Sequence, residues 1–173
     1  CDYRPYPGQR FAAVAAALCG GSAFAWLVDT CRAWVGDLGL PVPDHGSVYA
    51  HLNRLALEAE PGGGLEVVPR FRGERHAPQE RGAISGIGPH PLALGPLANA
   101  LARGIVANLR EMLPEECRRD RSRVVGSGNA LRRLPVLRRA AEDVLGLPLE
   151  MMPDREEAAT GAALLARPHL EGA

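Results

Sequence analysis

Two segments of the chain share one design, in which a short apolar run reaches a glycine turn and a helical pattern follows. Residues 15–22 read AAALCGGS, and residues 123–129 read RVVGSGN. A chain that twice places glycine between an apolar strand and a helix folds most simply as an α/β domain. This repeated pattern constrains the fold more strongly than any single motif does.

Glycine lets a ligand approach the backbone closely, and the unpaired amides at the start of a helix attract anions. Two such turns could hold one nucleotide from opposite sides. Neither turn continues as the Gly-Lys-Ser/Thr of a Walker loop, and neither fits the GxGxxG dinucleotide pattern. From the residues alone, plain turn chemistry is therefore the simpler interpretation of each turn, and nucleotide binding is the alternative.

The rest of the chain alternates helices with short strands, which predicts an α/β or α+β fold. Residues 11–18 can be interpreted in two ways. Their alanines favour a helix, but a short apolar run that ends at a glycine turn is typical of a buried strand, and we predict a strand. Other expected strands cover residues 65–68, 82–87, 122–125 and 149–152. Expected helices cover residues 22–38, 47–59, 91–113, a segment after Asn129 that reaches Val144, and 154–166.

Three of these helices carry sequence signals for their first residues. We expect Ser22 and Ser47 to cap the first two helices, and Asp154 with Glu157 to form a capping box for the last. Residues 156–163 place very small side chains on one helix face, which predicts close packing of that face against backbone.

Composition excludes several classes of protein. Twenty acidic and twenty basic residues cancel, so no overall charge attracts nucleic acid or a membrane. The longest apolar run, residues 11–18, is too short to span a bilayer. The four cysteines (Cys1, Cys19, Cys31, Cys117) show no CxxC spacing, and the five histidines repeat no ligand interval. We therefore expect no metal site, no disulfide framework and a cytoplasmic setting.

Arginines gather in residues 70–81 and again in residues 118–139. Such patches can bind phosphates or RNA. A site for nucleic acid would also be expected to have aromatic side chains among the arginines, and only Phe71 lies among them. A solvated, partly ion-paired surface is therefore the better interpretation. We expect Glu74 to be structural and to pair with Arg72 and Arg75. Asp29, inside a helix, is also expected to be structural.

Taken together, the motifs resemble the C-terminal domain of the FGGY carbohydrate kinases. Residues 124–131 (VVGSGNAL) resemble that family's adenosine loop, and residues 154–163 (DREEAATGAA) its closing helix. Residues 18–22, followed by Trp26 and Leu27, resemble the glycine turn that begins the first helix of the domain. The similarity runs in order from Tyr3 to His169.

Two further motifs narrow the resemblance within the family. Residues 73–76 (GERH) with Pro78, and residues 104–109 (GIVANL), are similar to the members that phosphorylate sedoheptulose. Ser127 departs from the family's triple-glycine loop at its middle position, and Thr160 departs from its alanine-rich helix. Both changes are small enough to keep the turn and the packing.

The resemblance implies an actin-like, ribonuclease-H-like ATPase fold of two domains with the substrates in the cleft between them. This chain would be the C-terminal half: residues 1–9 an extended lead-in from an N-terminal region, and residues 10–170 the nucleotide-side domain. Gly20 and Gly21 would lie near the phosphates of ATP. The adenosine would lie near Gly126, Ser127, Gly128, Asn129 and Leu131.

The implied reaction moves the γ-phosphoryl group of Mg-ATP to a terminal hydroxyl of sedoheptulose, and depends on positioning and electrostatic stabilisation. The family's Asp-x-Gly-Thr phosphate loop is absent from these residues, and the segment holding its catalytic base would precede Cys1. No catalytic residue is therefore assigned, and the isolated chain is expected to be inactive. The alternatives are a non-catalytic actin-like module that binds nucleotide or protein, and, less favoured, a nucleic-acid binder.

Overall fold

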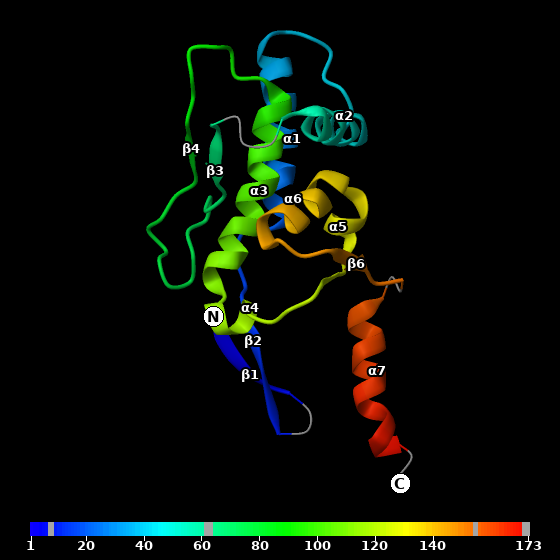
Figure 1. The fold of residues 1–173 in the computed structure, drawn as a ribbon. Coiled ribbons are helices and arrows are strands. Elements are labelled where there is room, and N and C mark those ends of the chain that lie inside the picture. The colour runs from blue at the N-terminus through cyan, green and yellow to red at the C-terminus, as the bar shows by residue number, and fades with distance from the viewer. Residues whose placement is uncertain (7–8, 61–63, 154–155, 171–173) are drawn as a thin grey trace.

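The computed structural model describes residues 1–6, 9–60, 64–153 and 156–170, as a helical body with short strands at its edges (Figure 1). Helices alternate with strands along the chain. In order, the elements are β1 (Asp2–Tyr6), β2 (Arg10–Val14), α1 (Gly21–Asp37), α2 (His45–Glu58), β3 (Glu66–Val68), β4 (Ala83–Ser85), α3 (Leu94–Met112), α4 (Glu115–Arg118), β5 (Val124–Gly126), α5 (Asn129–Arg133), α6 (Pro135–Leu145), β6 (Leu149–Met151) and α7 (Glu157–Leu170).

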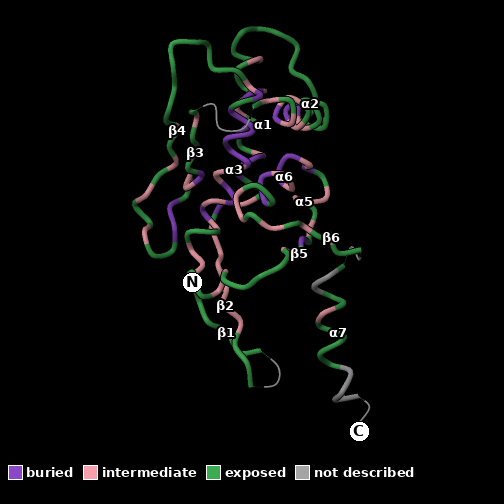
Figure 2. The backbone as a smooth tube through the Cα atoms, viewed as in Figure 1, coloured by how far each residue is buried: buried purple, intermediate pink, exposed green. Residues whose placement is uncertain are grey.

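The core lies among α1, α2, α3 and α6, where the buried residues gather (Figure 2). Its largest fully buried apolar side chains come from all four helices: Phe24, Leu27, Leu52, Leu101 and Val136. Each repeats at helical spacing with other apolar residues of its own helix, so each helix turns one apolar stripe inward. Burial of such side chains stabilises the fold by about 1.5–3 kcal/mol each.

The long helix α3 sits at the centre because two of its glycines admit neighbouring backbone. A β-carbon on Gly104 would lie 1.9 Å from the carbonyl oxygen of Val67, and one on Gly95 would lie 2.8 Å from that of Leu55. Strand β3 and helix α2 can therefore approach α3 only where it lacks side chains.

The described strands form three separate pairs. β1 pairs antiparallel with β2, with Tyr3 opposite Ala13, and β3 pairs antiparallel with β4. β5 and β6 are parallel, with Gly126 opposite Met151. The parallel pair requires a crossover, which α5 and α6 provide. Strands were predicted near all of these positions except β1, although β2 ends at Val14 and not at Leu18.

Both predicted serine caps are wrong. Helix α1 begins at Gly21 with Gly20 as its N-cap and no side-chain cap, so Ser22 is already its second residue. Helix α2 begins at His45, and its cap is Asp44, whose side chain accepts a hydrogen bond from the amide of Ser47. In the second case an equally good capping residue, Asp44, lies three positions before the serine, and the helix begins there.

The helix expected after Asn129 is divided into α5 and α6. Pro135, the first residue of α6, lacks the amide that a continuous helix would need, so the chain restarts there. The last helix is present as α7, but residues 154–155 of its predicted capping box lie outside the described residues.

The predicted close packing of the small-residue face on α7 is wrong. Ala159, Thr160, Ala162 and Ala163 are exposed, and no atom outside the helix's own backbone lies within 4 Å of a β-carbon placed on Gly161. Figure 1 shows α7 leaving the helical body beyond β6, on the side where the β1–β2 hairpin also projects. None of the described helices is both long and apolar enough to cross a membrane.

Candidate functional site

The first predicted turn forms the N-terminal end of α1, a helix of 17 residues. Gly20 is its N-cap, and the Gly20 carbonyl accepts a hydrogen bond from the amide of Ala23 at 2.9 Å. Cys19, just before it, is buried, whereas no atom lies within 4 Å of a β-carbon placed on Gly20. The buried Cys19 thus fixes one side of the turn, and the space beside Gly20 is open. On this open side the first amides of the helix can meet an anion.

The second predicted turn begins at the buried end of β5. A β-carbon on Gly126 would lie 2.9 Å from Met151 Sδ, 3.0 Å from Leu149 Cδ1 and 3.1 Å from Leu131 Cδ1, so three apolar side chains pack closely over this glycine. Gly128 has a φ of 89°, and no atom lies within 4 Å of a β-carbon placed on it. The backbone conformation at Gly128 therefore favours glycine, and at Gly126 a larger residue would have to displace the side chains packed against it.

The predicted polar and apolar residues of this turn differ in their exposure. Ser127 and Asn129 are exposed and available to a ligand. Leu131 is half-buried beneath Gly126, so its side chain supports the turn from inside. The turn is fixed further by a hydrogen bond of 2.9 Å from the Met152 amide to the Gly126 carbonyl.

The two turns lie next to each other. A β-carbon on Gly21 would lie 3.4 Å from Cβ of Ala130, which follows Asn129 at the start of α5. The structure therefore brings the segment of Gly20 and Gly21 together with the segment from Gly126 to Leu131, which is the arrangement that binding of one nucleotide by both turns requires. Contacts of these seven residues with ATP remain a prediction.

None of the seven residues carries a titratable side chain. Recognition at this place would rest on backbone amides, one hydroxyl and one carboxamide, which suit phosphates and a nucleoside. Arg138 stiffens the neighbouring segment, since its Nη1 donates to the carbonyl oxygens of Leu131 and Arg132 at 3.0 and 3.2 Å.

Several of the remaining arginines are ion-paired, as the sequence predicts. Arg103 pairs with Asp143 at 3.1 Å and Arg123 with Glu150 at 2.9 Å. The predicted pairing of Glu74 with Arg72 and Arg75 is wrong. Glu74 is buried, and its hydrogen bonds come from Asn108 and from the backbone amide of Leu18.

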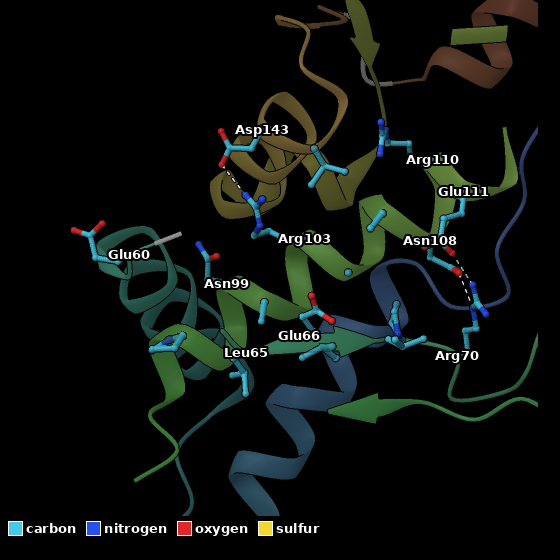
Figure 3. A pocket seen from close by; sticks show the side chains of 18 residues that line it. Glu60, Leu65, Glu66, Arg70, Asn99, Arg103, Asn108, Arg110, Glu111 and Asp143 are labelled. Carbon is cyan, nitrogen blue, oxygen red and sulfur yellow. Dashed lines mark hydrogen bonds and ion pairs between the residues drawn. The ribbon is translucent and has the colours of Figure 1, made fainter. Parts of the chain in front are cut away.

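A groove of about 620 Å³ lies on another face, between α3, β3 and α6 (Figure 3). Its lining includes charged side chains from four segments: Glu66, Arg70, Arg103, Glu111 and Asp143. None of the seven predicted residues lines it. The groove and the pair of glycine turns are thus distinct features of the surface.

Metal ligands are not gathered in the described part of the chain, where no three His, Cys, Asp or Glu side chains lie together in a way that could hold an ion. Sequence reasoning did not single out Asn108, which is buried in α3 beside the Glu74 carboxylate. A signal existed: Asn108 follows Leu101 and Ile105 at helical spacing, so a polar side chain occupies a core position.

The chain matches the model of the C-terminal domain of the FGGY family of carbohydrate kinases over residues 3–167. It is 35% identical to a sedoheptulokinase from Homo sapiens over 170 residues, which are 97% of this chain and 35% of that protein. It is 37% identical to a sedoheptulokinase from Mus musculus over 93% of this chain and 34% of that protein. The chain therefore spans about a third of the length of these curated relatives.

Among solved structures, a xylulose kinase from Bifidobacterium adolescentis superposes with a TM-score of 0.64 at 26% sequence identity. The match covers 91% of this chain and 29% of that one.

Proposed function

Because the chain belongs to the FGGY family of carbohydrate kinases, we propose that it supplies the ATP-binding half of a kinase that phosphorylates sedoheptulose. The observation that carries the proposal is the close approach of the two glycine turns, at Gly21 and Ala130. Two curated relatives that cover nearly the whole chain are sedoheptulokinases, and this favours sedoheptulose as the sugar.

The residues of the two turns fit a nucleotide. The helix α1 directs its first amides toward the turn at Gly20, where the phosphates would lie. Gly126, Ser127, Gly128, Asn129 and Leu131 would form the adenosine side, with the exposed Ser127 and Asn129 as hydrogen-bonding groups. No atom lies within 4 Å of a β-carbon placed on Gly20 or Gly128, so a ligand could approach the backbone at these two residues.

ATP would supply the phosphoryl group, and this chain's residues would bind and orient it. Mg²⁺ would be held by the phosphates of the nucleotide. The catalytic base and most sugar contacts would come from another region of the kinase. Residues 10–170 would form the nucleotide-side domain, and the cytoplasm would be its location.

Calorimetric titration of ATP into the chain tests the binding step, with Gly128→Val as the variant. A valine there would crowd the nucleotide, so ATP affinity should fall at least tenfold. Valine also strains the backbone at a φ of 89°. The matched control is Gly39→Val, at a φ of 72° and with equally open surroundings, at the far end of α1. Equal ATP affinity of the Gly128→Val variant and its parent would remove the second turn from the site.

A panel of ketoses and other sugars, assayed with the full-length gene product and Mg-ATP, tests the substrate. Sedoheptulose should give the highest kcat/KM. ATP binding without transfer to any sugar would favour the non-catalytic actin-like module instead.

A further inference from the structure

Glu74 is an almost fully buried carboxylate. It lies in the loop between β3 and β4 and is 1% exposed. Its Oε1 accepts a hydrogen bond from Asn108 Nδ2 at 2.8 Å, and its Oε2 accepts one from the backbone amide of Leu18 at 3.4 Å. Burying a charged group is costly unless it is well hydrogen-bonded, so these two donors define what holds it.

These hydrogen bonds belong to a longer series in which the donor and the acceptor of each bond are fixed. Arg70 Nε donates to Asn108 Oδ1 at 2.9 Å, and Figure 3 shows these two side chains meeting at the end of the groove. Arg70 is held in turn by Glu80 at 2.6 Å and Glu111 at 2.8 Å. Because an arginine can only donate, it fixes the carbonyl of Asn108 toward itself and the amide nitrogen toward Glu74.

This series of hydrogen bonds, from Arg70 through Asn108 and Glu74 to Leu18, ends at the glycine turn. Leu18 immediately precedes Cys19 and Gly20, so a fixed Leu18 amide sets the path by which the backbone enters α1. The same loop holds α1 by a second contact, in which the rings of Phe71 and Trp26 pack with centroids 4.4 Å apart. The loop between β3 and β4 thus contacts both the turn and the first part of the helix.

We propose that Glu74 is a positioning residue that holds the turn at Gly20 and Gly21 in the shape that binds nucleotide phosphates. The inference rests on the proposed function. Glu74 would touch neither nucleotide nor sugar and would act through the Leu18 amide. Arg70 and Asn108 would keep the two carboxylate oxygens of Glu74 in place.

The variant Glu74→Gln tests this at constant side-chain shape. The carboxamide of the variant has one acceptor oxygen and one donor nitrogen, so it cannot accept from both Leu18 and an Asn108 held by Arg70. We expect about a tenfold loss of affinity for ATP and ADP. Adenosine, which would contact the other turn, should bind with unchanged affinity. A general loss of structure would weaken all three ligands alike.

The double variant Glu74→Gln with Asn108→Asp supplies the rescue. The new carboxylate on α3 accepts from both Arg70 and the new carboxamide nitrogen, while the carboxamide oxygen accepts from Leu18. Every hydrogen bond is thus restored with the same net charge. ATP affinity should return to within about threefold of the parent. The matched control is Glu66→Gln, which removes an exposed carboxylate from the neighbouring strand β3, outside this hydrogen-bond network, and should leave ATP affinity unchanged.

Amide hydrogen exchange of residues 15–24 gives a readout that needs no nucleotide. Exchange should be faster in Glu74→Gln than in the parent, and restored in the double variant. Equal exchange, equal ATP affinity, or failure of the double variant to recover would each overturn the inference while leaving the proposed function intact. If the parent chain bound no ATP, the proposed function would fail, and the nucleotide role of Glu74 would fail with it; a changed exchange rate would then show a structural anchor alone.

Discussion

Gly21 lies beside Ala130, so that a β-carbon added to Gly21 would sit 3.4 Å from Cβ of Ala130. One residue begins α1 and the other belongs to the first turn of α5. Because α1 packs in the core with α2 and α3, and α5 lies beside the parallel pair β5–β6, this proximity brings the start of α1 next to the parallel pair. The candidate site is a property of this junction and of neither turn alone.

Gly21→Ala should separate stability from binding. The new methyl group meets Ala130 at an ordinary contact distance, and alanine favours a helix more than glycine does. We expect an unchanged or slightly higher Tm in a thermal melt. The methyl group would also stand between the first helical amides and a phosphate, so ATP affinity should fall about fivefold or more in a calorimetric titration. A lower Tm with unchanged affinity would contradict this account.

Gly104→Ala should destabilise the fold strongly. Its methyl group would lie 1.9 Å from the carbonyl oxygen of Val67, a backbone atom that cannot move without separating β3 from α3. We expect a loss of about 3 kcal/mol in the free energy of unfolding, measured by urea denaturation. The control is Gly161→Ala in α7, where no neighbouring atom lies within 4 Å and stability should not fall.

The sequence predicted the fold class and the order of most elements because both follow from local patterns. Apolar residues at helical spacing, such as Leu97, Leu101 and Ile105, are buried as expected. The similarity to a solved xylulose kinase confirms the α/β fold of a sugar-kinase domain. The predicted meeting of the two glycine turns is also present in the structure.

Features that depend on long-range contacts were not predicted. The partners of Glu74 come from α3 and from the segment after β2, and nothing in the neighbouring Arg72 and Arg75 indicates them. The small residues of α7 predicted close packing, but small size only permits an approach and does not supply a partner. The prediction that Ser47 caps α2 is wrong for a local reason, because Asp44, three residues earlier, occupies the N-cap position.

Exposed apolar side chains on the β1–β2 hairpin and on α7 should promote self-association. Tyr3, Phe11, Leu164 and Leu165 are each more than half exposed. Exposed apolar surface of this kind favours association in water. We expect the mass measured by light scattering to rise with protein concentration, and the variant Leu164→Ser with Leu165→Ser to reduce that rise. A concentration-independent monomer mass for the parent would contradict the prediction.

Asp44 should make the stability of α2 depend on pH. Its carboxylate accepts hydrogen bonds from the Ser47 hydroxyl at 2.5 Å and the Ser47 amide at 3.0 Å, and these bonds lower the pKa of Asp44 below its ordinary value of 3.8. A lowered pKa means that the folded protein binds the proton less readily than the unfolded chain does. The stabilisation is therefore complete above the ordinary pKa and is lost as the pH falls through the folded-state pKa.

Two variants isolate this charge. Asp44→Ala removes the cap and should lower the Tm at pH 7, whereas Asp44→Asn keeps an acceptor for the Ser47 amide without a titrating group. The Tm difference between the parent and Asp44→Asn should be present at about pH 7 and shrink as the pH falls below the ordinary pKa of the carboxyl group. Since Asp44 is exposed, salt should also reduce the difference. A difference that stayed constant over this acid range would mean that the carboxylate charge does not stabilise this helix end.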